Sequence, residues 1–417
     1  MKNKLTLIIC LLLITTLILA ACSSPSADLM KGITSKNKDR VPGTMDTELN
    51  LAILNFTWNM FKESSNNEGN LMISPPSAYL ALAMTLNGAD KNTKAEMLKA
   101  LSADNITLDD LNIGLHDWTN SLMSNNRIAK LSITNSIWLR EGFNANKDFL
   151  QTNADYYSAY IRSLDFGNES APKTINKWVK DATNDTIDKI VDEISDDVML
   201  YLINAIYFKG DWKVQFNANK TYKAEFNTPR GKLKADFMTR RGEIDYLQSN
   251  NISGVVLPYL DEQFAFVGLL PEEGKTPKDL INDLSALDLL SLLKNKESKN
   301  IELSLPKFES SYEDSLKNEL SSLGMNIAFE PNNADFSLMR EDLLKDLYIS
   351  EVRQKTYIKV DEKGTEAAAV TSVTAETTSM PVELPRVVFD RPFVYGIVDV
   401  TTGIPLFIGI MENPTIK

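Results

Sequence analysis

The sequence is poor in the side chains that most catalytic and metal sites need. Among 417 residues there is one histidine, His116, and there are two cysteines, Cys10 and Cys22. Nucleophilic sites of the Ser-His-Asp and Cys-His kinds need a histidine as base, and zinc sites usually need several histidine or cysteine ligands. His116 lies in a predicted helix without an obvious partner, and we interpret it as a packed or surface residue. We therefore expect no enzyme activity, no metal and no cofactor.

Basic residues are also too few for a polyanion-binding protein. The chain has 44 Lys and Arg against 56 Asp and Glu, which gives a formal net charge of −12. Nucleic-acid binding depends on a basic face, and no Lys/Arg cluster here outnumbers its acidic neighbours, so we expect no nucleic-acid partner. The remaining composition is 43% hydrophobic and 24% charged. It is typical of a globular protein with one large domain or two.

The N-terminus has the pattern of a lipoprotein signal. Two lysines precede an apolar run over residues 5–21, and the tetrapeptide Leu-Ala-Ala-Cys over residues 19–22 matches the prokaryotic lipobox. We expect residues 1–21 to be a signal peptide that is cleaved before Cys22, whose thiol is diacylated. The protein would then be extracytoplasmic and lipid-anchored to a prokaryotic membrane surface. An uncleaved membrane anchor is the alternative.

The chain changes character after the signal. Residues 22–43 begin with the lipidated Cys22 and are rich in Ser, Lys, Asp and Pro without periodicity. This composition predicts a flexible tether that holds a globular domain off the membrane. Because cleavage would also remove Cys10, no disulfide can form. The domain over residues 44–417 must therefore be held by its own core.

Helical patterns come first in this domain, and strand patterns dominate later. Apolar spacing predicts a helix over residues 49–61 capped by Thr44 or Asp46, two short helices over 78–100 broken at 87–89, and another over 175–191. Strands are predicted over residues 133–139, 200–208, 254–257, 264–270, 301–305, 357–360, 387–389, 393–400 and 405–411, with a hairpin turn at 401–403. This order is typical of an α+β fold with large, mostly antiparallel sheets.

The segment over residues 361–381 is long for a loop of a packed domain. Loops beyond about 12–15 residues without structure of their own are uncommon and usually functional. Read at period two from Thr365, one face is small, uncharged and partly β-branched, whereas every charge after Gly364 lies on the other face. The segment therefore has the pattern of a strand that could bury one face. A flexible Thr/Ala-rich linker is the alternative.

Several motifs resemble the signatures of the serpin family, in the order expected there, from about Asp46 to the C-terminus. They lie at residues 70–77, 81–84, 88–89, 204–212, 305–308, 323–325, 360–369, 390–393 and 407–409. The resemblance implies an α+β serpin fold. This fold has about eight or nine helices around three β-sheets, and an exposed reactive-centre loop able to insert into the large sheet.

The resemblance also implies a suicide inhibitor of extracellular serine proteases, or sometimes of cysteine proteases. The target attacks the exposed loop and forms an acyl-enzyme, and the cut loop then inserts as a new strand and traps it. Small residues must enter the sheet first, because a charge there would delay insertion until the acyl-enzyme hydrolyses. The loop hinge comprises Glu362, Gly364, Thr365, Glu366, Ala367, Ala368 and Ala369.

The scissile bond follows from the spacing implied by the resemblance. The forward count from Gly364 places the cut between Thr378 and Ser379, whereas a count back from Pro392 gives Pro381. We prefer the forward count, because the distance from hinge to cut sets how far the protease is carried. Thr378 would suit an elastase-like or broad-specificity protease. A cut at Glu376 would instead suit a glutamate-preferring enzyme.

A polar cluster beneath the opening sheet, the shutter, and a gate at its top, the breach, are further implications of the resemblance. Ser74, Ser77 and Asn204 match the shutter, and Gln354 stands where the family usually has a histidine. Because glutamine does not titrate in the physiological range, sheet opening should depend little on pH. Trp212 matches the breach residue. Helix capping, strand-edge bonding and plain core packing are the alternatives for these residues.

Three other functions compete with inhibition. A non-inhibitory serpin, acting as a protease substrate, carrier or chaperone-like surface lipoprotein, would keep the fold. Such members disrupt the hinge, whereas residues 365–373 contain only Glu366 as a charge. A solute-binding lipoprotein would need two α/β lobes with alternating helices. A hydrolase would need more than one isolated histidine. We expect an inhibitory monomer.

Overall fold

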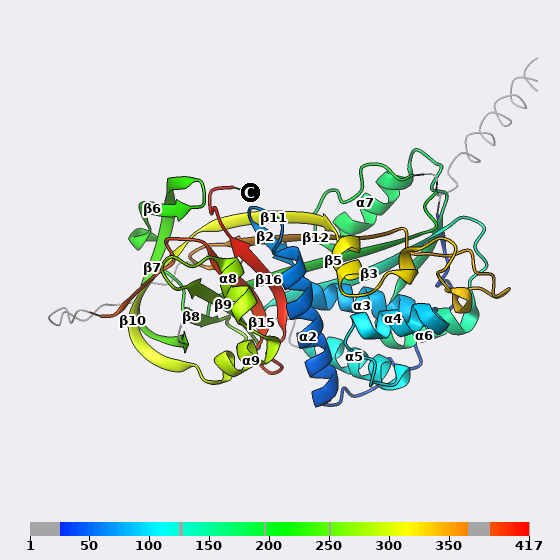
Figure 1. Cartoon of the computed structure of the whole chain (residues 1–417), viewed down its shortest axis with the longest axis horizontal. Coiled ribbons are helices and arrows are strands. Elements are labelled where there is room, and N and C mark those ends of the chain that lie inside the picture. Colours follow the sequence, from blue (N-terminus) through cyan, green and yellow to red (C-terminus); the bar gives the residue numbers. More distant parts are fainter. Residues whose placement is uncertain (1–25, 125–127, 196, 250–251, 366–383, 417) are drawn as a thin grey trace, which may run out of the picture.

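The computed structural model describes residues 26–124, 128–195, 197–249, 252–365 and 384–416, which form two sheets with helices packed around them (Figure 1). The first sheet has the strand order β1-β4-β3-β5-β13-β12-β11. Its strands are β1 (Ser26–Asp28), β3 (Lys130–Arg140), β4 (Tyr160–Leu164), β5 (Leu200–Asp211), β11 (Phe308–Ser315), β12 (Glu351–Val360) and β13 (Gly364–Thr365). Most pairs are antiparallel, but β3 with β4 and β5 with β12 are parallel.

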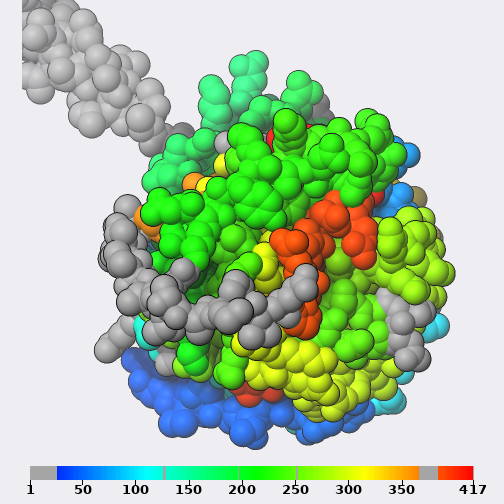
Figure 2. Space-filling view, turned by 90° about the vertical axis from the view of Figure 1, so that its left-hand side faces the viewer, coloured from blue at the N-terminus to red at the C-terminus, as the bar shows by residue number. Residues whose placement is uncertain are grey.

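The second sheet has the order β14-β10-β7-β8-β9-β15-β16-β2, with β6 paired to β7. Its strands are β2 (Leu71–Ile73), β6 (Tyr222–Thr228), β7 (Gly231–Ser249), β8 (Ile252–Pro258), β9 (Phe264–Pro271), β10 (Glu297–Pro306), β14 (Arg386–Val388), β15 (Phe393–Asp399) and β16 (Pro405–Met411). Figure 2 views the end of the molecule where the surfaces of β6, β10 and β14 adjoin.

The described helices confirm the α+β class, and none of them is long and apolar enough to cross a membrane. They are α2 (Thr47–Ser64), α3 (Pro75–Leu86), α4 (Lys91–Ala100), α5 (Leu108–Met123), α6 (Lys147–Tyr157), α7 (Ala171–Ala182), α8 (Pro277–Asp283), α9 (Ala286–Lys294) and α10 (Lys317–Ser322). In Figure 1, α7 lies on one side of the first sheet, and α3 to α6 lie on the other.

Local sequence explains the first helices. The Asp46 carboxylate caps α2 by accepting from the backbone N–H of Glu48 at 2.7 Å, and the apolar face of α2 is buried. Every residue of α3 is buried, as expected for a helix that is apolar all round. The predicted break between the two short helices is confirmed, because α3 ends at Leu86 and α4 begins at Lys91.

The predicted helix over residues 175–191 is wrong beyond Ala182. The Thr183 hydroxyl donates to the carbonyl of Val179 at 2.8 Å and accepts from the N–H of Ile187 at 3.1 Å. Asn184 and Asp185 then adopt φ of 50° and 63°, a left-handed conformation that these two residue types tolerate. Helical spacing after residue 182 therefore reflected buried side chains in an irregular segment.

The count of three sheets also needs correction for the described residues, whose ladders form two. The long strand β7 pairs with β6 over its first half and with β8 near its end, and β10 pairs with β7 along its whole length. The strands of the second sheet are thus joined through β7 and β10 by continuous hydrogen bonding. The expected antiparallel pattern is confirmed for most pairs.

The predicted flexible tether over residues 22–43 differs from the structure from Ser26 onward. Residues 26–28 form β1 at the edge of the first sheet, antiparallel to β4. Farther along, the Arg40 guanidinium donates to both carboxylate oxygens of Asp117 at 2.8 and 2.9 Å. The segment lacks periodicity because it binds as an irregular strap whose partners lie far along the chain. Cys22 and the predicted signal peptide lie outside the described residues.

Candidate functional site

The predicted loop hinge enters the first sheet at one end. Thr365 pairs with Gly210 of β5 and with Val360 of β12, and Gly364 pairs with Asp211. The Thr365 side chain is buried, and its hydroxyl lies 2.6 Å from the hydroxyl of Tyr259. The two strands β5 and β12 pair directly over residues 201–205 and 351–355, toward the opposite end. The hinge therefore stands at the mouth of the interval in which one more strand would lie.

The close backbone contacts around residue 364 require a glycine at this position. A Cβ built there would lie 2.1 Å from the carbonyl oxygen of Gly210 and 2.7 Å from the Cα of Asp211. Both atoms belong to the backbone and cannot rotate away. A side chain at residue 364 would therefore expel β13 from its place between β5 and β12.

Trp212, the predicted breach residue, makes several contacts near the hinge. Its indole stacks on Tyr259, with ring centroids 4.8 Å apart and an interplanar angle of 12°, and it is buried. The indole N–H donates to the carbonyl of Asp361 at 2.8 Å, and the backbone N–H of Trp212 donates to the carbonyl of Lys363 at 2.8 Å. Trp212 therefore packs in the core and also bonds to the chain that leads into the hinge.

Glu362 anchors the same segment through charge. The Lys307 ammonium lies 2.8 Å from one carboxylate oxygen of Glu362, and the Thr221 hydroxyl donates to the other at 2.6 Å. Burial alone would raise the pKa of Glu362, but the hydrogen bonds from Lys307 and Thr221 outweigh burial and lower the pKa from its ordinary value. Glu362 is therefore a carboxylate at neutral pH, and it fixes the start of the loop.

The shutter residues meet beneath the middle of the sheet. Gln354 accepts from the backbone N–H of Ser74 at 2.7 Å, and its amide nitrogen donates at 2.8 Å to the carbonyl of Ser74 and to the side chain of Asn204. Asn204 in turn donates to the hydroxyl of Ser77 and to Asn135. Gln354 and Asn204 are also direct partners across β12 and β5. Separation of these strands would break this side-chain bridge.

The sequence did not single out Tyr259, Lys307 or Asn135 for these contacts. Lys307 lies in one of the quoted motifs, but nothing in its neighbours indicated a carboxylate partner 55 residues away. Tyr259 follows the apolar run of β8, which gave no sign that it packs under the breach. These contacts depend on pairings between distant segments, so spacing along the chain carries no signal for them.

Part of the predicted site lies outside the described residues. This part comprises Glu366, Ala367, Ala368 and Ala369 of the hinge, and both residues of the scissile bond, Thr378 and Ser379. The site that the structure brings together consists of the hinge residues 362–365, the breach and the shutter.

His116 is packed rather than exposed. Its Nδ1 lies 3.1 Å from a carboxylate oxygen of Asp117, and its Nε2 lies 3.0 Å from the amide nitrogen of Asn120. Within the described residues, no three His, Cys, Asp or Glu side chains group as metal ligands would.

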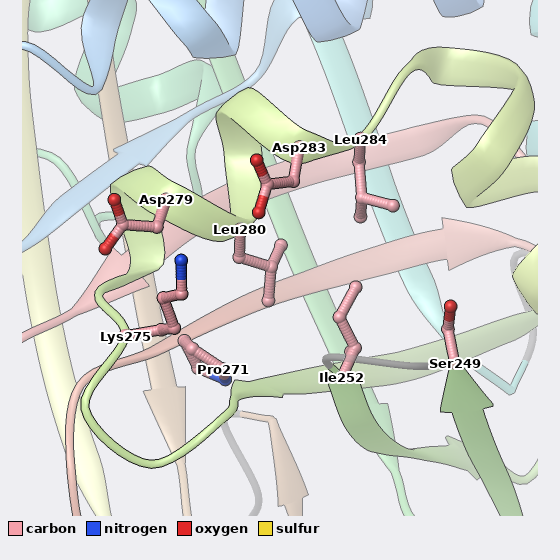
Figure 3. A pocket seen from close by; sticks show the side chains of 8 residues that line it. All are labelled: Ser249, Ile252, Pro271, Lys275, Asp279, Leu280, Asp283 and Leu284. Atoms are coloured by element: carbon pink, nitrogen blue, oxygen red, sulfur yellow. The ribbon is translucent and has the colours of Figure 1, made fainter.

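A pocket of about 220 Å³ lies apart from the hinge, between α8 and the start of β8 (Figure 3). Ile252 and Leu280 project into it from these two elements. Asp279, at its edge, is already engaged in a capping box with Thr276. The polar groups of the pocket are thus partly used by the helix itself, and we assign no ligand to it.

Comparison with known proteins identifies the family of the chain. A family model described as serpin (serine protease inhibitor) matches residues 51–414. The chain belongs to the serpin family. Serpins are mostly protease inhibitors rather than enzymes, and this serpin has relatives of both established and uncharacterised function.

Two relatives illustrate this difference in how far the function is characterised. An uncharacterised serpin-like protein of Thermococcus kodakarensis is 34% identical over 87% of this serpin and 85% of its own length. An alpha-1-antiproteinase of Rattus norvegicus is 31% identical over 97% of this serpin and 98% of its own length.

Among solved structures, the thermophilic serpin tengpin in its native state has a TM-score of 0.86 and 38% identity, covering 93% of this chain and 99% of that one. Tengpin in its latent state has a lower TM-score of 0.76 at 38% identity, covering 89% of this chain and 99% of that one. The described structure of this serpin is thus more similar to the native form.

Proposed function

We propose that this serpin inhibits extracellular serine proteases by suicide trapping, from a prokaryotic membrane surface to which Cys22 anchors it through lipid. One observation carries the proposal of trapping. The first two loop residues already pair with β5 and β12, at the mouth of the interval that an inserted strand would fill. A loop that continues this pairing would become the central strand of the first sheet.

The register supports this continuation along the whole sheet. Thr365 pairs with Gly210 in antiparallel fashion, so each later residue would pair one position nearer to the start of β5. In this register residue 375 would face Leu200, the first residue of β5. The acyl-bearing Thr378 would then lie three residues beyond the sheet, which agrees with the forward count for the cut.

The faces of the loop agree with the pattern of its sequence. Thr365 points into the core toward Tyr259, so the residues at period two from it would also point inward. These are Ala367, Ala369, Thr371, Val373 and Ala375, all of them small and uncharged. Glu366 and Glu376 would point to the other face. Insertion would therefore bury no charge on the core side.

The free energy of insertion is sufficient for a trap. About ten new residue pairs, at roughly 0.5–1.5 kcal/mol net per hydrogen bond, add to burial of Ala, Val and Thr methyl groups at about 0.8 kcal/mol per carbon. Together these contributions are on the order of 10–20 kcal/mol. The uncut protein is then metastable, and the acyl-enzyme is carried along the sheet before it can hydrolyse.

The residue at the predicted cut indicates the class of target protease. Thr378 is small and β-branched, so we propose an elastase-like or broad-specificity serine protease as partner, with a cysteine protease as a second class. We propose that the serpin acts as a monomer, because loop insertion into the first sheet needs only one chain.

The test uses the mature chain expressed from residue 22 with C22S, which carries no lipid. It is mixed with a panel of serine and cysteine proteases and resolved on a denaturing gel, and the released C-terminal peptide is weighed. We expect a denaturant-stable complex with an elastase-type enzyme and a peptide that begins at Ser379. Cleavage in the loop without any complex would contradict trapping and favour a non-inhibitory serpin that serves as substrate or carrier.

A further inference from the structure

The N-terminal strap, residues 26–46, lies along the molecule between the predicted lipid anchor and the first helix. Its first three residues pair with β4, from Ser26 opposite Leu164 to Asp28 opposite Arg162, and the N–H of Leu29 donates to the carbonyl of Ile161 at 3.1 Å. The Arg162 guanidinium donates to the hydroxyl and the carbonyl of Ser26 at 3.1 and 3.0 Å. The strap therefore has a fixed register at the edge of the first sheet.

The rest of the strap is held by polar contacts and by partly buried apolar side chains that pack against the core. The N–H of Lys36 donates to the carboxylate of Asp155 at 2.7 Å. Arg40 binds Asp117 through two hydrogen bonds, and the N–H of Gly43 donates to the same carboxylate at 3.0 Å. The apolar side chains of the strap, Leu29, Met30 and Ile33 among them, are at most partly buried, and the buried core begins at Leu49. The strap is thus bound without a buried apolar anchor, so its release would open no cavity in the core.

The bound strap places the lipid anchor at one end of the sheet. Ala27 pairs with Ser163, Ser163 with Leu139, and Leu139 with Leu200, so Ala27 lies level with the start of β5. The chain that precedes Ala27 leaves the sheet at that end, because β1 runs in the same direction as β5. Only three residues lie between Cys22 and Ser26, and the four Cα–Cα steps from one to the other span at most about 14 Å. A membrane that holds Cys22 would therefore lie directly beside this end of the sheet.

The same end would receive the trapped protease. In the register of the hinge, Thr378 would leave the sheet just beyond Leu200. The inserted strand would be four strand spacings from β1, across β4, β3 and β5, which is about 19 Å sideways. A protease domain of about 230 residues is roughly 45 Å across. It would not fit into a gap of about 14 Å between the sheet and the membrane.

Release of the strap would resolve this conflict. The chain from Cys22 to Asp46, which caps α2, would then span up to about 80 Å. We propose that the strap is a releasable tether: it holds the uncut serpin close to the lipid surface, and it must detach from β4, Asp155 and Asp117 for a membrane-bound serpin to trap a protease. This inference rests on the proposed trapping and on lipidation of Cys22.

A disulfide across the strap tests the proposal. Ala27 and Ser163 are direct partners of an antiparallel pair, whose Cα atoms lie about 4.5–5.5 Å apart, within the range of a disulfide. The variant A27C/S163C is prepared as the lipidated mature protein in phosphatidylcholine vesicles, and also as the unlipidated chain from residue 22 with C22S. The yield of denaturant-stable complex with the same protease is measured after oxidation and after reduction.

We expect oxidation to lower the yield at least tenfold on vesicles, with the loop still cleaved, and to leave the yield of the unlipidated chain unchanged. A further variant adds a flexible linker of twenty Gly and Ser residues between Cys22 and Ser26, and it should restore the yield of the oxidised protein on vesicles. Equal yields from oxidised and reduced protein on vesicles would overturn the proposal, as would an equal loss in the unlipidated chain. Absence of complex from the unlipidated chain in both redox states would instead overturn the proposed function itself, and the tether proposal with it.

Discussion

Thr365 is the residue at which substitution should convert the inhibitor into a substrate. Its side chain is 1% exposed and its hydroxyl lies 2.6 Å from that of Tyr259, between β5 and β12. An arginine in this position would bury an unpaired charge at a cost of several kcal/mol. It would also leave the Tyr259 hydroxyl unpaired, which costs about 1–3 kcal/mol more.

Only part of this free-energy cost needs to raise the barrier to loop insertion. A barrier raised by about 3 kcal/mol slows insertion roughly 150-fold, which gives hydrolysis of the acyl-enzyme time to win. The number of serpin molecules consumed per protease inhibited should therefore rise steeply in Thr365→Arg, with the loop still cleaved. The matched control is Thr401→Arg, which places the same charge on an exposed turn. An unchanged yield of covalent complex in Thr365→Arg would refute the role of this residue in the hinge.

Three further experiments test the shutter, the start of the loop and the cut. Because Gln354 does not titrate, the inhibition rate should be flat between about pH 5.5 and 8, and a steep profile would contradict the shutter assignment. Lys307→Ala should loosen the start of the loop by about 1 kcal/mol, measured as faster hydrogen exchange at residues 361–365. The folded-state pKa of Glu362 is lowered, so this contribution is fully present above its ordinary pKa and should be lost in the wild type as the pH falls through the lowered folded-state pKa. Equal exchange in both proteins at pH 7 would count against the ion pair. Thr378→Arg should move inhibition toward trypsin-like proteases, and elastase-type inhibition that survives intact would show that the cut lies elsewhere.

The sequence predicted well the elements that have a strong periodicity. The helices α2, α3 and α4 and the apolar strands β5, β9, β15 and β16 were expected within a few residues, because each buries an apolar face that repeats along the chain. The strands β6, β7 and β11 were missed because they carry many charged residues and only weak alternation. β6 and β7 form a local hairpin, whereas the pairings of β7 with β10 and of β11 with β12 join distant segments that a single sequence does not display.

Part of the candidate site was likewise predicted from the sequence, and part was not. The hinge residues Gly364 and Thr365 stood out through spacing and residue size, and the structure places them between β5 and β12. The contacts of the strap were not predicted, because its partners Asp117 and Asp155 lie far along the chain. Contacts of this kind depend on the finished fold, so composition alone describes such a segment as linker.

Thermal unfolding of the serpin before and after loop cleavage tests the account most directly. A protease that cuts the loop of the unlipidated chain and then dissociates leaves the cut form, whose loop should insert beside β5 as a new strand. Insertion worth about 10–20 kcal/mol, spread over the unfolding entropy of roughly 390 residues, should raise the unfolding midpoint by about 10–25 °C. Hydrogen exchange at β5 and β12 should slow in the same form. A midpoint that stays the same or falls after cleavage would contradict insertion as the source of the trap.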